Sequence, residues 1–309
     1  MQISFTLFIK ISAIHLLEKV IIVFVLSTFF LYVNSLLIFT FFKKDYFRTT
    51  MRYIFFVHAM FCDCLFLFLA IFFLILIFFN FTMPIGICLI VCYMMEVMTF
   101  TSPLTLTAMS LERYVAICMP LRHSEISYVR RAFNCIIIIH AVSSVEPITM
   151  TVIYIASVPH HIYTSNALCQ VEVFIIHTWQ QHLRVVMTNV YFLVMFSAIL
   201  FSYGKIMQAA NRATSSNGKS AARGLKTVIL HGLQLLPSLI QLWCPFVEQA
   251  FLNVDVYMYM EVRYFNYIVF MLSPRCLCPL VYGLRDEKFF MALKQYAFCG
   301  VKKVSPTKT

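Results

Sequence analysis

The sequence is short of charge and glycine, and it lacks nucleotide-binding motifs. Only 12% of its 309 residues are charged and seven are glycine, whereas an ordinary soluble domain has about 25% charged residues. It contains no GxGxxG, P-loop or Walker-type lysine, the motifs that hold phosphates in nucleotide-binding proteins. No repeat of fixed period is visible and the glycines are scattered, which argues against a transporter built from inverted halves.

Hydrophobic residues are present in great excess. They make up 61% of the chain and include 32 phenylalanines, against about 45–50% apolar residues in a soluble domain. Large apolar patches left in water drive aggregation, whereas lipid accepts them. The composition therefore predicts an integral membrane protein.

Seven apolar runs are long enough to cross a bilayer, which requires about 20 residues in a helix. They are residues 20–42, 53–79, 87–118, 132–157, 184–208, 224–250 and 263–284. Strands of a lipid-facing barrel would alternate over about ten residues, and these runs do not. We therefore expect an all-α membrane protein, a bundle of seven transmembrane helices.

Positive charge is concentrated in alternate breaks between the runs. Nineteen of the 24 Lys and Arg residues fall in residues 43–52, 113–131, 205–226 and 285–308. Cytoplasmic loops are rich in these residues, so we expect an extracellular N-terminus (1–19), an uncleaved first span and a multi-pass protein of the plasma membrane. Contact with anionic membrane lipids then explains the net charge of +11, and no nucleic-acid partner is needed.

Two motifs and two polar residues carry a resemblance to a known family. "MSLERYVAICMPLRH" (109–123) has Glu-Arg-Tyr at the inner end of the third span, and "CPLVYGLRDEKF" (278–289) contains a P-x-x-Y motif. Asn34 and Asp63 match the polar residues of spans one and two. The sequence resembles the rhodopsin-type (class A) G-protein-coupled receptors and, within them, the odorant receptors, most closely those of fish.

The resemblance implies a seven-helix receptor domain over residues 20–298, with a short amphipathic helix at 286–298 and a cytoplasmic tail at 299–309. It implies an odorant receptor, not an enzyme, which binds small molecules from outside and activates a stimulatory, olfactory-type heterotrimeric G protein. The alternative is a non-olfactory chemosensory or pheromone-type receptor. Cys299 is either a palmitoylation site or a plain tail cysteine.

The resemblance assigns the G-protein-coupling switch to the inner ends of the helices. Arg113 is held by the adjacent Glu112 in the resting receptor and is released when span six moves outward, and Tyr114 completes the triplet. Tyr203 and Tyr282 are the expected hydroxyl partners of Arg113 in the active state. The competing interpretation is an arginine whose charged end simply reaches the membrane surface.

Asp63 lies in the middle of the second span, where a carboxylate is costly unless it is paired, protonated or bound to a cation. The resemblance implies a polar core of Asn34, Asp63 and Ser102 that binds a sodium ion as an allosteric modulator, and no other cofactor. A structural role with bound water is the second interpretation.

The resemblance places Cys88 at the outer end of the third span, and Cys169 is the only cysteine of the second outer loop. An oxidising compartment favours a disulfide between them, which would hold the loop over the ligand pocket. Cys92, one turn below Cys88, is a competing partner. Asn80 begins an Asn-Phe-Thr glycosylation sequon close to the membrane.

The ligand pocket is expected between the outer halves of spans three, five, six and seven. Glu96 is 17 residues before Arg113, about 25 Å further out along a helix. The candidate pocket residues are Met95, Glu96, Thr99, Glu248, Tyr264 and Tyr267. The two carboxylates predict a cationic small-molecule odorant. The competing interpretation is a Glu96 that is protonated or paired with a neighbouring tyrosine or histidine.

Four histidines crowd the second outer loop, and neutral imidazole is a common metal ligand. They are His160, His161, His177 and His182. Their spacing matches no fixed metal motif, so no metal site is predicted. The carboxylates within the spans form no catalytic motif either, and an intramembrane enzyme is not expected.

Overall fold

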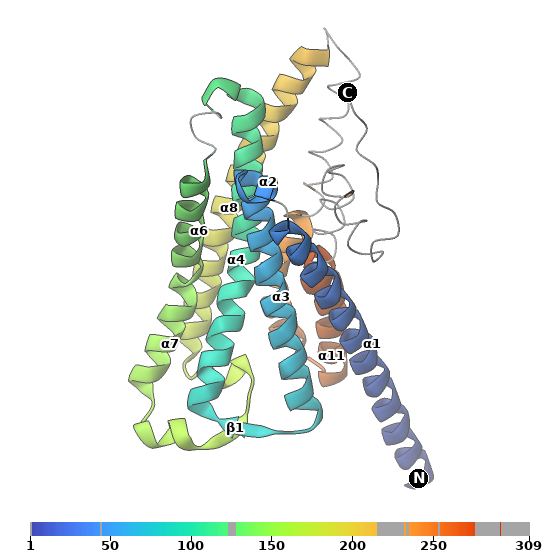
Figure 1. The fold of residues 1–309 in the computed structure, drawn as a ribbon. Coiled ribbons are helices and arrows are strands. Elements are labelled where there is room, and N and C mark those ends of the chain that lie inside the picture. The colour runs from blue at the N-terminus through green and yellow to red at the C-terminus, as the bar shows by residue number, and fades with distance from the viewer. Residues whose placement is uncertain are drawn as a thin grey trace.

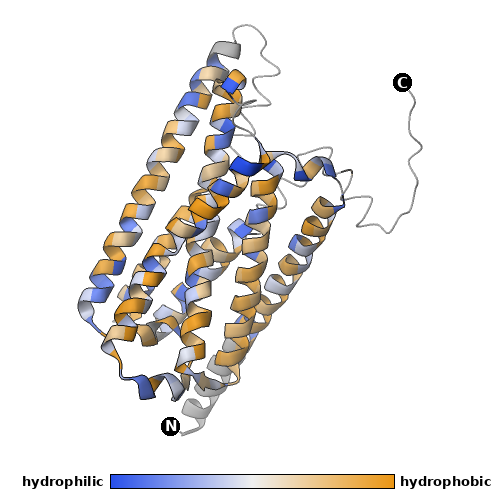
Figure 2. Cartoon of the chain, turned by 60° about the vertical axis from the view of Figure 1, so that its left-hand side comes forward, coloured by the Kyte–Doolittle hydropathy of each residue, from blue (hydrophilic) through white to orange (hydrophobic). Residues whose placement is uncertain are grey.

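The computed structural model describes residues 2–43, 45–122, 128–214, 232, 235–252, 254–275 and 291. It is a bundle of long helices with a two-stranded sheet at one end (Figure 1). Hydrophobic residues predominate along the helices, and hydrophilic segments gather near their ends (Figure 2). A bilayer offers no water to backbone polar groups, so apolar runs of this length form helices with internal hydrogen bonds.

Six helices in the described part of the chain are long and apolar enough to cross a membrane. They are Leu17–Phe42, Met51–Phe78, Ile85–Cys118, Val129–Ser157, Thr178–Ala209 and Leu235–Leu252. These six correspond to the first six predicted runs. The seventh run is described only as far as residue 275.

The first half of the bundle contains α1 (Gln2–Phe42), the short α2 (Asp45–Arg48), α3 (Met51–Phe78) and α4 (Ile85–Cys118). Helix α1 begins well before the first predicted span, because residues 2–19 contain no glycine or proline that would stop a helix. Side chains of α1, α3, α4 and α8 form the largest buried cluster, which includes Phe55, Met60, Phe100 and Met195.

The fourth predicted run is divided into α6 (Val129–Ser143) and α7 (Val145–Ser157). Pro147 has no N–H to donate to the carbonyl of Ser143, four residues earlier, so the helix is interrupted at Ser144. The interruption gives Glu146 a position at the start of α7, where its side chain is fully buried.

The long helix α8 (Thr178–Thr214) begins six residues before the predicted fifth run. The Gln180 side-chain oxygen accepts hydrogen bonds from the backbone N–H groups of Ile176 and His177, both at 2.7 Å. This side-chain contact satisfies backbone donors just before the helix. A hydropathy pattern contains no information on such a contact. The helix was therefore predicted to begin at residue 184, six residues too late.

The last described elements are η3 (Gln241–Trp243), α10 (Cys244–Leu252), α11 (Val256–Asn266) and the π-helical η4 (Tyr267–Leu272). Helix α11 begins before the predicted start at residue 263 because Asp255 caps it, accepting from the Tyr257 N–H at 3.0 Å. Apart from residue 291, the predicted amphipathic helix (286–298) and tail (299–309) lie outside the described residues.

The sheet joins the loop between α3 and α4 to the loop between α7 and α8. Strand β1 (Thr82–Pro84) pairs antiparallel with β2 (Asn166–Leu168), and the short 3-10 helices η1 (His160–Thr164) and η2 (Val171–Phe174) flank β2. The N-terminal end of α1 lies at the same end of the bundle as β1 (Figure 1). This end carries the candidate ligand site.

Candidate functional site

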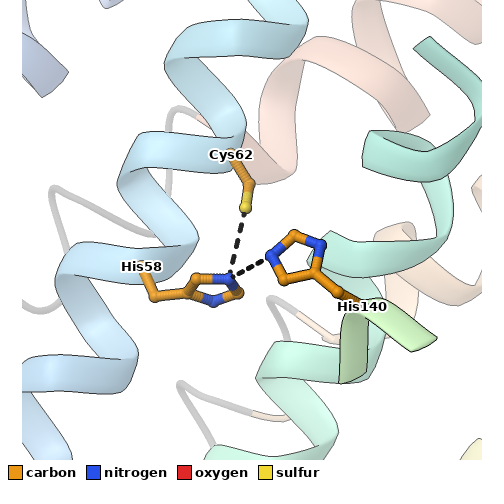
Figure 3. Close-up of side chains that lie close together, drawn as sticks. All are labelled: His58, Cys62 and His140. Carbon is orange, nitrogen blue, oxygen red and sulfur yellow. Dashed lines mark hydrogen bonds between the residues drawn. The ribbon is translucent and has the colours of Figure 1, made fainter. Parts of the chain in front are cut away.

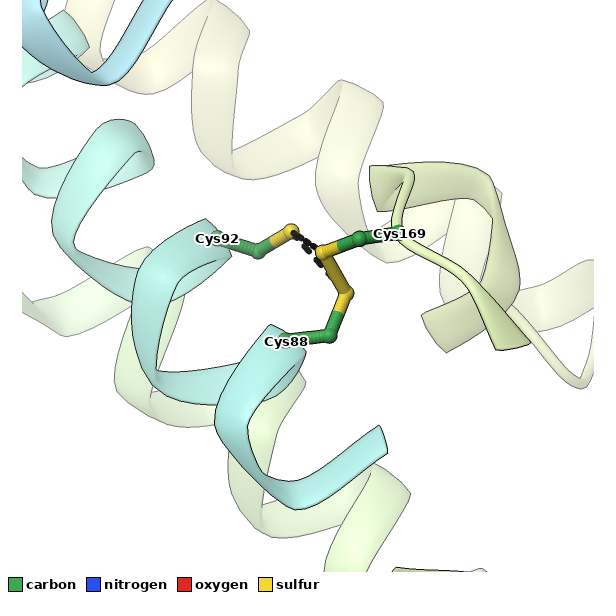
Figure 4. Close-up of a disulfide and its surroundings, with 3 residues drawn as sticks. All are labelled: Cys88, Cys92 and Cys169. Atoms are coloured by element: carbon green, nitrogen blue, oxygen red, sulfur yellow. Dashed lines mark hydrogen bonds between the residues drawn. A yellow bond between two sulfur atoms is a disulfide. The ribbon is translucent and has the colours of Figure 1, made fainter. Parts of the chain in front are cut away.

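A disulfide ties the loop between α7 and α8, the predicted second outer loop, to α4. Cys88, in the first turn of α4, is bonded to Cys169 (Figure 4), as predicted. The Cys92 sulfur lies 3.9 Å from the Cys88 sulfur and 4.0 Å from the Cys169 sulfur. Three sulfur atoms therefore gather where the loop meets the helix, and two of them are bonded.

A cavity lies beside this disulfide, between α4, α7, α8 and the second outer loop. The cavity is small, with a volume of about 30 Å³ for the centres of water-sized molecules, and it is partly open to solvent. Its apolar walls include Leu89, Tyr93, Met150, Phe174 and Ile175. Cys92, Thr151, Glu96 and Arg184 also line it. Ligand sites typically combine apolar walls with a few polar groups, so this cavity is the candidate ligand site.

An ion pair stands in the cavity wall. Arg184 Nη2 donates a hydrogen bond to Glu96 Oε1 at 2.8 Å. Arg184 Nε also lies 3.4 Å from Oε1 of the buried Glu146. One guanidinium from α8 is therefore placed between carboxylates from α4 and α7. When all three groups are ionised they carry one net negative charge, which favours a further cation nearby.

Of the predicted pocket residues, the structure brings Glu96 to this cavity. Met95 and Tyr267 pack against one buried cluster of α3 and α4 side chains, as does Tyr93 of the cavity wall. The Thr99 hydroxyl donates to the Met95 carbonyl at 2.9 Å. Arg184, one of the five Lys and Arg residues outside the basic breaks, was not among the predicted site residues. Its position at the start of an apolar run was the available signal.

Glu248, Tyr264 and Tyr267 do not line this cavity in the described part of the chain. Glu248 accepts a hydrogen bond from Asn266 Nδ2 at 3.1 Å. The Tyr267 hydroxyl lies 3.4 Å from Ser27 Oγ, and the Tyr264 ring lies under the Lys19 ammonium group. These contacts join α11 and η4 to their neighbours, so the expected convergence with Glu96 is not observed.

The polar core around Asp63 contains an unexpected cation. Ser102 Oγ donates to Asp63 Oδ1 at 2.9 Å, so these two predicted core residues are in contact. The Nε atom of Arg275 lies 3.6 Å from the same oxygen, and its Nη1 donates to Gln241 Oε1 at 2.8 Å. A guanidinium of the protein itself therefore lies against the carboxylate for which a sodium ion was expected.

Arg275 is held on its other side by the face of the Phe66 ring, 3.7 Å from the ring centre. Arg275 is one of the five Lys and Arg residues outside the lysine- and arginine-rich breaks, and it was not predicted to contact Asp63. A charged residue inside a predicted span was the signal for its role. Asn34, the third predicted core residue, is fully buried in α1.

The predicted switch residues lie at the opposite end of α4. Arg113 is 7% exposed and Glu112 is half-buried. The Tyr114 ring meets the Phe201 ring edge-on, with centres 5.2 Å apart. The Tyr203 ring lies 3.8 Å from the point that a Cβ atom on Gly232 would occupy, so α8 is close to the predicted sixth span there. Tyr282 lies outside the described residues.

Asn80 stands in the tight turn between α3 and β1. Its φ of 52° lies in the left-handed region, which asparagine tolerates better than most residues. The side chain is exposed, so the sequon is open to solvent, and its glycosylation stays a prediction.

Two groups of metal-ligating side chains gather in the described part of the chain. The first is Cys88, Cys92 and Cys169, of which two are bonded. The second is His58, Cys62 and His140, inside the bundle. The second group was not predicted, although histidine and cysteine four residues apart lie on one helix face. Over the same described residues, the four loop histidines form no such group.

Comparisons with known proteins agree with this architecture. Residues 33–282 match the family described as 7 transmembrane receptor (rhodopsin family). The chain is 42% identical to "Odorant receptor 131-2" of Danio rerio over 94% of this chain and 91% of that protein. It is 25% identical to "Olfactory receptor 2H2" of Homo sapiens over 63% of this chain and 62% of that protein. It is 27% identical to "Galanin receptor type 1" of Rattus norvegicus over 71% of this chain and 64% of that protein.

Proposed function

The chain belongs to the rhodopsin family of seven-transmembrane receptors, and from this premise we propose that it is an odorant receptor for a small, ammonium-bearing molecule. The family and the nearly full-length similarity to Odorant receptor 131-2 support the receptor function. Receptors of this family are G-protein-coupled and are not enzymes. The ligand class rests on one observation, the Arg184 guanidinium between Glu96 and Glu146.

The ligand is proposed to replace Arg184 as the partner of Glu96. Its ammonium pairs with Glu96 from the cavity, while Arg184 keeps the carboxylate of Glu146. The buried Glu146 then stays compensated, which matters because an uncompensated charge in a low-dielectric site is costly. The apolar part of the ligand lies against walls such as Tyr93 and Phe174.

This exchange would couple binding to the arrangement of the helices. The three charged residues lie on α4, α7 and α8, so a ligand that weakens the bond between Glu96 and Arg184 changes how α4 meets α8. A ligand shifts an equilibrium between two states only through different affinities for them. Because the amine competes with Arg184 for Glu96, its affinity differs between the state in which this ion pair is formed and the state in which it is broken.

Arg275 supports a revised proposal for the polar core. We expected a sodium ion at Asp63, and the guanidinium now stands where a cation is needed. A covalently attached cation does not dissociate, so the carboxylate stays compensated whatever the sodium concentration. The core would then respond to the movement of the segment that carries Arg275 and not to an ion.

At the inner end, Arg113 is the proposed switch, and its burial supports a contact that is exposed only when the helices separate. We propose a stimulatory, olfactory-type G protein as the partner on that face. The extracellular orientation of the N-terminus is proposed from the positive charges of the opposite end. A disulfide at the same end as the N-terminus agrees with it, since extracellular surfaces are oxidising.

The test is a cAMP assay in cells that express the receptor with an N-terminal epitope and the olfactory stimulatory G protein. The epitope is stained on intact cells, which measures orientation and surface level together. The challenges are small amines, amino acids, carboxylates and neutral odorants. The variants are Glu96→Gln, Arg113→Ala and the control Glu261→Gln, which changes a rim glutamate paired with Lys19.

We expect an amine to raise cAMP and Glu96→Gln to raise its EC50 at least about tenfold, a loss of about 1.4 kcal/mol. Glu261→Gln should respond as the wild type does, and Arg113→Ala should be silent at equal surface level. An unchanged EC50 in Glu96→Gln would show that the ligand does not bind at Glu96. Responses to neutral molecules alone would disprove the ligand class.

A further inference from the structure

Three side chains with metal-binding atoms converge inside the bundle, away from the ligand cavity (Figure 3). They are His58 and Cys62 of α3 and His140 of α6. The Nε2 atoms of the two histidines lie 2.9 Å apart, and the Cys62 sulfur lies 3.6 Å from His58 Nε2. None of the three lines the cavity beside Glu96.

The hydrogen bonds around His58 orient one ring nitrogen toward the group. The Thr105 hydroxyl donates its hydrogen to the Thr101 carbonyl at 2.8 Å. Its oxygen, 3.3 Å from His58 Nδ1, is therefore an acceptor for an N–H at Nδ1. This tautomer leaves a lone pair on Nε2, which points at Cys62 and His140 (Figure 3). A hydrogen bond from the second ring nitrogen is the usual support for a metal-binding histidine.

Two of the three distances between ligand atoms are close to those around a small metal ion, and all three are within 4.8 Å. Zinc lies about 2.0–2.1 Å from a histidine nitrogen and about 2.3 Å from a cysteine sulfur, so tetrahedral geometry separates these two atoms by about 3.6 Å. The observed separation of 3.6 Å between Cys62 and His58 matches it. The two histidine nitrogens, 2.9 Å apart, must separate by about half an ångström to share an ion.

Two of the three side chains are only partly buried. Cys62 is almost completely buried, whereas His58 and His140 are only half-buried. Their rings meet edge-on between α3 and α6, with centres 5.0 Å apart. Polar side chains inside a membrane protein need a partner, and here each of the three faces another metal-binding atom.

We propose that His58, Cys62 and His140 bind one closed-shell metal ion, Cu⁺ or Zn²⁺, and that this ion joins α3 to α6. These are the ions that thiolate together with imidazole selects. On binding, the Cys62 S–H bond breaks, a metal–sulfur bond forms and the proton leaves to solvent. His140 moves its ring proton from Nε2 to Nδ1 so that Nε2 can bind.

The two ions differ in the charge of the complex. Two neutral imidazoles and one thiolate give a neutral complex with Cu⁺ and a complex of charge +1 with Zn²⁺. A net charge is costly in the membrane interior, so we expect Cu⁺ to bind more tightly than Zn²⁺. Cu⁺ also accepts three ligands, whereas Zn²⁺ almost always takes a fourth.

The test is metal titration of the purified, full-length receptor in lipid nanodiscs. Co²⁺ replaces Zn²⁺ as a spectroscopic probe, since a cobalt–thiolate bond gives an absorption band in the near ultraviolet. Cu⁺ is supplied in competition with a coloured copper chelator, and Zn²⁺ with a fluorescent one. The variants are Cys62→Ser, His140→Gln and the control Cys64→Ser, which removes a half-buried thiol two residues along α3.

We expect one ion per receptor in the wild type and in Cys64→Ser. Cys62→Ser should lose the cobalt–thiolate band, and His140→Gln should bind at least about tenfold more weakly. If Cys62→Ser fails to fold, the metal affinity of His140→Gln is compared with that of the wild type. Binding of Zn²⁺ but not Cu⁺ would support the metal site and contradict the expected preference for Cu⁺. Absence of binding, or equal affinity in His140→Gln and wild type, would overturn the proposal.

Discussion

The Nε atom of Arg275 lies 3.6 Å from Oδ1 of Asp63, and both side chains are almost completely buried. Ser102 donates to that same carboxylate oxygen at 2.9 Å. A buried carboxylate in a membrane protein must be compensated, and here a residue of the same chain supplies the positive charge. The pair links α3 to the segment after η4.

Arg275→Gln should destabilise the receptor by about 3–5 kcal/mol, because it leaves the Asp63 carboxylate buried without its guanidinium. Adding Asp63→Asn should recover much of that loss, since both charges are then removed. Thermal unfolding of the purified variants measures both effects. Arg263→Gln is the control, because that half-exposed side chain, 4.0 Å from Glu248, should contribute about 0–1 kcal/mol. Additive losses in the double variant would show that the two residues are not coupled.

The wild-type receptor should unfold at the same temperature in sodium chloride and in N-methylglucamine chloride of equal ionic strength. The reason is that Arg275 already stands beside Asp63. Arg275→Ser should make the unfolding temperature depend on sodium, because it removes the competing cation and adds a small oxygen ligand. A sodium-specific shift in the wild type would contradict the proposal that Arg275 replaces the ion.

Cys88→Ser should retain a disulfide, because the Cys92 sulfur lies 4.0 Å from that of Cys169. Disulfide mapping by mass spectrometry should find Cys92 bonded to Cys169 in this variant, together with partial surface expression. Cys88→Ser with Cys92→Ser should lose the bond and most of the surface receptor. The matched control is Cys64→Ser, which changes a half-buried α3 cysteine outside the sulfur group of the outer loop. A free Cys169 thiol in the single variant would disprove the exchange.

Arg184→Gln should reduce the amount of receptor at the cell surface, because it leaves the fully buried Glu146 without the guanidinium 3.4 Å away. A charge that loses its buried partner typically costs about 3–5 kcal/mol. Adding Glu146→Gln should restore surface expression, measured by flow cytometry of intact cells. No restoration would show that Arg184 acts mainly through Glu96.

The disulfide and the first six membrane helices could be predicted from the sequence. Length and hydropathy are local properties, and a run of about 20 apolar residues has few alternatives to a membrane helix. The helix ends were less accurate, because side chains such as Gln180 and Asp255 fix them through hydrogen bonds. Hydropathy carries no information on those contacts.

The sequence by itself determined the class of the protein, its family resemblance and the presence of costly charges inside the membrane. Only the tertiary structure decided which residues compensate them. Glu96 and Arg184 are 88 residues apart in the chain, and His58 and His140 are 82 apart. Their meeting depends on how each helix is rotated about its axis and packed against its neighbours. That rotation is set by the fit of many side chains at once, which no single stretch of sequence expresses.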